Sequence, residues 1–262
     1  MTIKAAVQFS GGAASYVAAK LTLDEFGHDD TALVFADTKI EDGDLYRFLA
    51  DVEKRLNHPV TWIADGRDPW QVFNDERMMG NTRADMCSRI LKRELLDRWR
   101  RDNAPDAAVI IGFDANEAHR LDTTSARMAP VKVRAPLIER GIWREGAHEI
   151  VKADGIRLPR LYRMGFPHNN CGGFCIKAGQ GGFALLLEHF PARYAYHEAQ
   201  EEAFRAATGK DVAIMRDRTG GTTKPLTMRA FRERHQRQPH LTDMFDLGAC
   251  NCMEPPEQSE AA

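Results

Sequence analysis

The stretch that decides the fold is "AAVQFSGGAASYVAAKL", residues 5–21. Its apolar run predicts a buried strand, and Ser10-Gly11-Gly12 separates this run from a helical pattern. Glycines let the backbone approach a ligand closely, because no Cβ intervenes. A helix that starts at such a turn presents unpaired N–H groups and the positive end of its dipole. The stretch therefore predicts a turn that binds a phosphate or pyrophosphate, with hydroxyl donors from Ser10 and Ser15. The alternative is a tight turn with a serine cap.

Similar apolar runs recur along the first half of the chain. Residues 31–37, 60–65 and 107–114 read as further buried strands, with helical stretches between them at 14–26, 44–57 and 88–101. Strands that are apolar throughout and alternate with helices predict a parallel sheet with helices on both faces, an α/β Rossmann-like fold. We expect this nucleotide-binding domain to cover residues 1–140. In such sheets the ligand lies outside the carboxyl ends of the strands.

The second half of the chain has a different character. We expect residues 141–262 to form a mainly helical C-terminal region that carries a cysteine-rich loop. One helix is predicted over about 192–208, and "HNNCGGFC" at 168–175 precedes another helical pattern.

Composition limits the class of protein. The 262 residues are 43% hydrophobic and 28% charged with a net charge of −2, so bulk charge does not indicate a nucleic-acid binder. No apolar run approaches the roughly 18–20 residues that span a bilayer, and the N-terminus does not read as a signal peptide. We therefore expect a cytoplasmic protein without a membrane partner. In that compartment spaced cysteines indicate metal ligands or reactive thiols more than disulfides.

Five cysteines stand in three groups. Cys171 and Cys175 flank a glycine-rich turn that can fold around a metal, and inert thiols are the alternative. A lone cysteine such as Cys87 is commonly a small buried apolar residue. Cys250 and Cys252 could instead form a redox pair or carry a persulfide.

Several segments together resemble one family. Ser10-Gly11-Gly12-x-x-Ser15 is similar to the PP-loop of the ATP pyrophosphatases, the adenine nucleotide alpha hydrolase-like group that includes the phosphoadenosine phosphosulfate (PAPS) reductases, the adenylyl sulfate reductases and several tRNA thiolation enzymes. Four later segments match the pattern of this family in its order, and the resemblance spans about residues 5–180. These segments are "FADTKIEDGDLYRFL", "MCSRILKREL", "IIGFDANEAHR" and "LPRLYRMGFPHNNCGGFC".

The resemblance implies an adenine nucleotide site, for ATP or adenylyl sulfate. By position, its binding residues would come from the loop, from the end of the second strand and from basic side chains that neutralise phosphate. They are Ser10, Gly11, Gly12, Ser15, Asp37, Thr38, Lys92, Gly112 and Arg120. Glu117 could hold Mg²⁺ together with substrate phosphates, and a salt bridge between Glu117 and Arg120 is the alternative.

The resemblance also implies an iron–sulfur cluster. In the similar enzymes, paired cysteines and one earlier cysteine hold it, which here would be Cys171, Cys175 and Cys87. Cys252 or Cys250 would supply a fourth thiolate. Three or four thiolates suit a [4Fe–4S] cluster, and four suit zinc equally well. Cys87, Cys171, Cys175 and Glu117 are accordingly the candidate catalytic residues.

Three departures from the family pattern affect the functional prediction. Ala14 stands where many PP-loops carry Asp or Lys, and Asp114 stands where sulfate reductases are basic. The C-terminal nucleophilic cysteine segment of the PAPS reductases has no counterpart beyond "GACNCMEPP". The first hypothesis is therefore adenylation of a substrate by ATP, followed by cluster-assisted sulfur transfer. The alternatives are reduction of adenylyl sulfate or its 3′-phosphate, and a nucleotide-binding protein with structural zinc and no turnover. The sulfur acceptor is unidentified, with nucleic acid as one candidate, and a sulfur donor or reductant protein is a possible partner.

Overall fold

Five parallel strands form the central sheet, in the order β3-β2-β1-β4-β5. The computed structural model describes residues 2–81, 85–218 and 221–248. The strands are β1 (Ala5–Gln8), β2 (Thr31–Ala36), β3 (Val60–Ile63), β4 (Ala108–Ile111) and β5 (Val133–Arg134). Four of them are the predicted strands. The two-residue β5, which follows Lys132 and contains Arg134, carried too little apolar pattern to be predicted.

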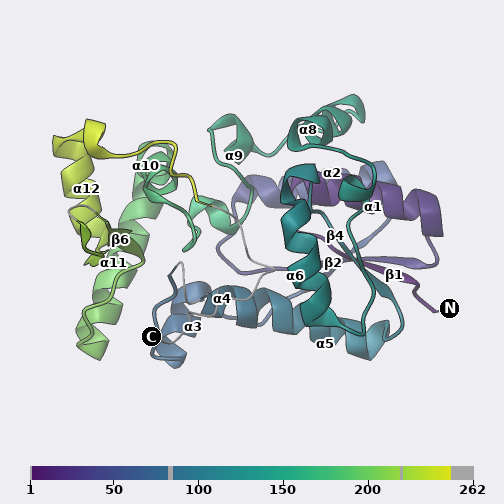
Figure 1. The fold of residues 1–262 in the computed structure, drawn as a ribbon, viewed down its shortest axis with the longest axis horizontal. Helices are drawn as coiled ribbons and strands as arrows, with labels where there is room; N and C mark the ends of the chain where they lie inside the picture. The colour runs from purple at the N-terminus through teal and green to yellow at the C-terminus, as the bar shows by residue number, and fades with distance from the viewer. Residues whose placement is uncertain (1, 82–84, 219–220, 249–262) are drawn as a thin grey trace.

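Side chains alternate between two covered faces of the sheet. On one face Val7, Leu33 and Ile110 share an apolar cluster with helices α1 (Ala13–Phe26) and α2 (Gly43–Leu56). On the other face Val34 and Ala36 pack against Leu96 of α5 (Glu94–Asn103). The two helical layers lie above and below the sheet in Figure 1. The predicted Rossmann-like fold, with helices on both faces, is thus confirmed.

The remaining elements of the first half follow or connect the strands. They are α3 (Pro69–Asp75), α4 (Met86–Ser88), the π-helical turn η1 (Arg89–Arg93), the short turn η2 (Ala115–Glu117), α6 (Ala118–Met128) and α7 (Pro136–Glu139).

After the sheet the chain is mainly helical. Its elements are α8 (Arg144–Ala153), α9 (Arg160–Arg163), the turn η3 (Cys171–Gly173), α10 (Gln180–His189), α11 (Pro191–Thr208), the hairpin β6 (Met215–Asp217) and β7 (Lys224–Leu226), α12 (Met228–Arg237) and η5 (Pro239–Leu241). Helix α8 packs on α1 and contributes to the core of the sheet, whereas α10, α11 and α12 gather at one end (Figure 1).

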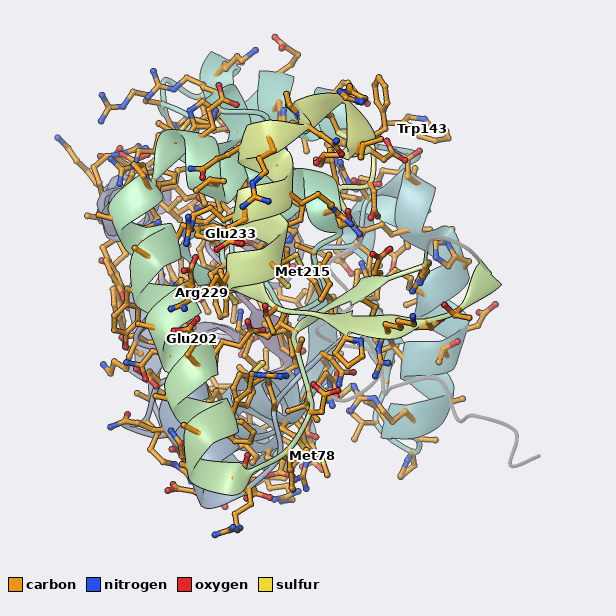
Figure 2. All side chains as sticks on the ribbon, turned by 90° about the vertical axis from the view of Figure 1, so that its left-hand side faces the viewer. Met78, Trp143, Glu202, Met215, Arg229 and Glu233 are labelled. Carbon is orange, nitrogen blue, oxygen red and sulfur yellow. The ribbon has the colours of Figure 1, made fainter. Side chains whose placement is uncertain are left out.

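Basic residues of α12 are paired with acidic residues of α11. Arg229 contacts Glu202, as Figure 2 shows, and Arg232 donates to both carboxylate oxygens of Glu198 at 2.8 Å. This basic stretch is therefore largely engaged in joining two helices. No helix in the described part of the chain is both long and apolar enough to cross a membrane.

Candidate functional site

The two glycines after β1 are required for different reasons. Gly11 has a φ of +77°, and a Cβ there would lie 2.9 Å from Cγ of Leu45. Gly12 is the N-cap of α1, and a Cβ there would lie 2.8 Å from the hydroxyl of Tyr162. Gly11 therefore allows the turn to pack on α2, and Gly12 leaves room for the Tyr162 hydroxyl at the start of α1.

The two serines of this turn, Ser10 and Ser15, have different roles. Ser15 is buried, donates to the carbonyl of Gly12 at 2.8 Å and accepts from the Gly12 N–H at 3.1 Å. Its hydroxyl therefore closes the first turn of α1. Ser10 is exposed and lines the cavity described next. The Tyr162 hydroxyl accepts from the Ala13 N–H at 3.3 Å, at the position where a helix N-terminus offers a donor to an anion.

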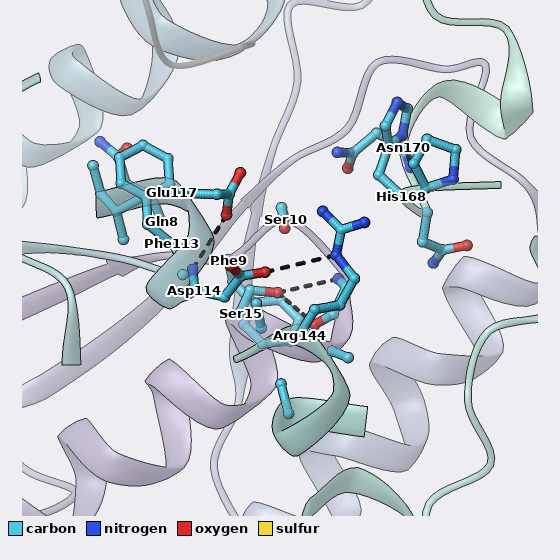
Figure 3. A pocket seen from close by; sticks show the side chains of 18 of the residues that line it. Gln8, Phe9, Ser10, Ser15, Phe113, Asp114, Glu117, Arg144, His168 and Asn170 are labelled. Atoms are coloured by element: carbon cyan, nitrogen blue, oxygen red, sulfur yellow. Dashed lines mark hydrogen bonds and ion pairs between the residues drawn. The ribbon is translucent and has the colours of Figure 1, made fainter. Parts of the chain in front are cut away.

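A cavity of about 470 Å³ opens at the carboxyl ends of β1 and β4, where the strand order reverses (Figure 3). Seven of the predicted binding or catalytic residues line it: Ser10, Gly12, Ser15, Lys92, Gly112, Glu117 and Arg120. A Cβ at Gly112 would lie 2.7 Å from the backbone nitrogen of Ser15, so this glycine lets β4 approach the first turn of α1. Apolar residues also line part of the cavity, among them Phe35, Leu96 and Ile111.

Asp37 and Thr38 are not among the described residues that line the cavity. The carboxylate of Asp37 accepts from Lys39 and from the Tyr46 hydroxyl at 3.0 Å. Burial alone would raise the pKa of Asp37, but these hydrogen bonds outweigh it and the pKa is lowered. Thr38 donates to Glu41 at 2.9 Å. Both residues thus shape the loop after β2.

The cysteine loop lies directly against the glycine turn. Asn169 donates from Nδ2 to the carbonyl of Gly11 at 2.9 Å, and the N–H of Cys171 donates to the carboxylate of Glu41. Cys171 and Cys175 are buried, and neither is among the described residues that line the cavity. The structure therefore brings residues 169–171 to the turn at 10–12, as the hypothesis of a shared site requires.

Cys87 lies in α4, just before the π-helical turn η1. It packs against the apolar cluster that contains Phe174 and Ile176, the two neighbours of Cys175. Among the described residues, no three His, Cys, Asp or Glu side chains form a group that could hold a metal ion. The described residues alone therefore do not fit a cluster or a zinc ion. Cys250 and Cys252, the candidates for a fourth ligand, lie outside the described residues, and the cluster stays a prediction.

Each basic side chain that lines the cavity, within the described residues, has a carboxylate beside it. Lys92 Nζ lies 3.6 Å from Glu41, Arg120 pairs with Glu117, and Arg144 Nε lies 3.6 Å from Asp114. Glu117 thus forms the salt bridge that was the alternative to a magnesium ligand. Asp114 is the N-cap of η2 and accepts from the Asn116 N–H at 2.8 Å.

Sequence reasoning missed four residues of this site: Arg144, His148, Tyr162 and Asn169. Arg144 and His148 are one turn apart on α8, a spacing that puts them on one face. The rings of His148 and Tyr162 lie 4.7 Å apart. Burial, together with the charges of Arg144 and Lys152, lowers the pKa of His148, so it is neutral at pH 7. The spacing on α8 was the available signal, but it does not tell which face meets the cavity.

No curated protein matches the chain at a significant level. A solved structure of phosphoadenylyl-sulfate (PAPS) reductase from Candida auris in complex with phosphate is similar, with 14% identity and a TM-score of 0.46 over 62% of this chain and 78% of that one. The family model of the phosphoadenosine phosphosulfate reductase domain matches residues 4–167, which include the glycine turn and most of the residues that line the cavity. With that match over more than half of its length, the chain belongs to the phosphoadenosine phosphosulfate reductase domain family.

Proposed function

We propose that this protein uses ATP to adenylate an acceptor and then replaces the adenylated oxygen with sulfur. An oxygen of the acceptor attacks the α-phosphorus of ATP, the bond to the bridging oxygen breaks, and pyrophosphate leaves. A sulfide ion, supplied by a donor, then attacks the acceptor carbon, the new C–S bond forms as the C–O bond breaks, and AMP leaves with the oxygen. Adenylation turns a poor leaving group into a good one.

One observation carries this proposal. A single cavity extends from the glycine turn, with the N-terminus of the 14-residue helix α1, to the cysteine loop at residues 168–170. A helix N-terminus stabilises the charge of phosphates, and Lys92, Arg120 and Arg144 add positive charge around the same space. The apolar end near Phe35 and Leu96 suits an adenine base.

The proposal involves Mg²⁺ and a second group, an iron–sulfur cluster or zinc. Mg²⁺ that is bound by the phosphates would neutralise charge on the departing pyrophosphate. The side chain of Asn169 in the cysteine loop donates to the carbonyl of Gly11, and this proximity of loop and turn supports delivery of sulfur to an acceptor there. No step of the proposed reaction passes through a cluster, because the described residues hold no group of three metal ligands. Iron and sulfide counted per chain after anaerobic purification would decide between a cluster and zinc.

Nucleotide binding is tested by Gly12→Asp. Asp is a good N-cap, so the fold should persist. Its carboxylate would occupy the anion position at the start of α1, and we expect ATP binding in isothermal titration calorimetry to be abolished. Gly12→Asn has the same size without the charge, and its loss should be at least tenfold smaller. Unchanged ATP affinity in Gly12→Asp would remove the turn from the site.

Reduction of adenylyl sulfate is the second candidate, and the family match favours it. The two candidates differ in their products. Pyrophosphate released from ATP supports adenylation, whereas sulfite and AMP formed from adenylyl sulfate with a thiol reductant support the reductase. Nucleotide binding without either product would leave a binding protein.

A further inference from the structure

The cation–carboxylate pairs around the cavity differ in how tightly the cation is held. Asp114 is buried and keeps its hydrogen bond from the Asn116 N–H whether or not a cation is near. Arg144 lies 3.6 Å from it, which is beyond a hydrogen bond. Arg144 can therefore move toward another anion. Asp114 would still accept the hydrogen bond from Asn116, so its buried charge would remain stabilised.

Arg144 is also the most exposed of these cations. Its side chain is 44% exposed, compared with 12% for Lys92 and 6% for Arg120. Arg144 lines the cavity, and Figure 3 draws its guanidinium on the side of Ser10 that faces His168 and Asn170. The neighbouring His148 is neutral at pH 7, so it does not repel a cation or compete for an anion. Arg144 thus brings a mobile positive charge to the mouth of the cavity.

A fixed element carries Arg144 to this place. It is the first residue of α8, whose Ala147 and Val151 are buried in the same cluster as Ala13 and Val17 of α1. The start of α8 is therefore held beside the start of α1. A nucleotide with its base at the apolar end and its first phosphates at the α1 N-terminus would extend its remaining phosphate toward α8.

We propose that Arg144 binds the terminal phosphates of a nucleoside triphosphate, and that it makes the site select a triphosphate over a nucleotide with a shorter anionic chain. This inference rests on the nucleotide site of the proposed function. A charged hydrogen bond of this kind contributes about 1.5–3 kcal/mol, or roughly a tenfold to hundredfold change in affinity.

The test measures the affinity of Arg144→Gln for ATP, ADP and AMP with Mg²⁺ by isothermal titration calorimetry. We expect the affinity for ATP to fall at least tenfold, that for ADP to fall less, and that for AMP to change less than twofold. Arg144→Lys keeps the charge without the planar fork and should lose ATP affinity only partly. Arg140→Gln, on an exposed arginine outside the cavity lining, is the matched control and should leave all three affinities unchanged.

The outcomes separate this inference from the proposed function. Wild-type affinity for ATP in Arg144→Gln would overturn the role of Arg144, and so would an equal loss of affinity for AMP and ATP. Neither result would contradict the proposed nucleotide site. Absence of ATP binding by the wild-type protein, with tight binding of adenylyl sulfate, would overturn both.

Discussion

At the scale of single residues, the turn after β1 makes a stability prediction at Gly11. Gly11→Ala would force a Cβ into a backbone with φ of +77° and to within 2.9 Å of Leu45. We expect a loss of about 2–5 kcal/mol in the free energy of unfolding, from left-handed strain of roughly 1–2 kcal/mol and overpacking of roughly 1–3 kcal/mol. Urea unfolding followed by circular dichroism measures it.

Gly209 supplies the control for left-handed strain. Its φ is also positive, +65°, and a Cβ there meets nothing within 4 Å. Gly209→Ala should therefore lose only the strain part, about 1–2 kcal/mol. Equal losses at the two positions would mean that contact with Leu45 does not matter.

The same turn illustrates how far the sequence predicted single residues. Ser10 and Gly12 line the cavity, and Ser15 also closes the turn, so both the binding turn and the serine cap that the pattern predicts describe this segment. Arg144 was not predictable, since its role depends on how α8 packs against α1. Asp37 and Thr38 lie near the right strand end, but local hydrogen bonds direct them to their own loop.

At the scale of elements, His197 joins three segments and predicts a pH dependence. It lies on α11, accepts from Trp70 Nε1 of α3 at 2.9 Å, and stacks on Phe174 of the cysteine loop at 3.6 Å between ring centroids. Burial, followed by the charge of Arg193, lowers the pKa of His197 to about 3. In the unfolded chain the pKa is about 6.5. Unfolding therefore takes up a proton between these values, and this part of the stability is full above pH 6.5 and lost as pH falls.

The variant His197→Gln isolates this effect. The wild-type protein should lose up to about 1.4 kcal/mol per pH unit more than the variant below pH 6.5, in urea unfolding at pH 7.5, 6.0 and 5.0. His240→Gln, on an exposed histidine, should keep the wild-type slope. Parallel curves for wild type and His197→Gln would contradict the low pKa of His197.

Sequence patterns predicted elements better than their irregularities. The helix expected over 88–101 is present, but η1 interrupts it with a π-helical turn at Arg89–Arg93 that carries Lys92. A π-helical turn changes the direction of the side chains that follow, and apolar spacing alone does not reveal it.

At the scale of the whole molecule, the candidate site lies where the sheet and the later helices meet. Segments around residues 12, 92, 114, 144 and 169 all contribute to one cavity. The sequence predicted the sheet side because strand, turn and helix are local patterns. It could not predict the other side, because loop contacts such as Asn169 to Gly11 form only in the folded chain.

Asp42 links the sheet region to the later helices through ion pairs with Arg160 and Arg193, which leads to a prediction about stability. It is fully buried at the start of α2, accepts two hydrogen bonds of 2.7 Å from Arg160, and accepts one of 3.1 Å from Arg193. Burial alone would raise its pKa, but the hydrogen bonds from Arg160, Asp44 and Arg193 lower it. Asp42→Asn keeps an N-cap and leaves two arginines without their carboxylate. Because both arginines are partly exposed, we expect a loss of about 1.5–3 kcal/mol in the free energy of unfolding, the range for a hydrogen bond to a charged group.

Asp51 provides a matched control for this prediction, and alkylation of Cys171 provides a second measurement. Asp51 on the same helix pairs with Arg47 at 2.7 Å but is 43% exposed, so Asp51→Asn should cost no more than about 1 kcal/mol. Arg193 also donates to the carbonyl of Gly172, so the loss of Asp42 should loosen the cysteine loop. Faster alkylation of Cys171 in native Asp42→Asn, measured by peptide mass spectrometry, would reveal that loosening. If Asp42→Asn and Asp51→Asn were equally stable, the buried cluster would not be what holds the later helices to the sheet.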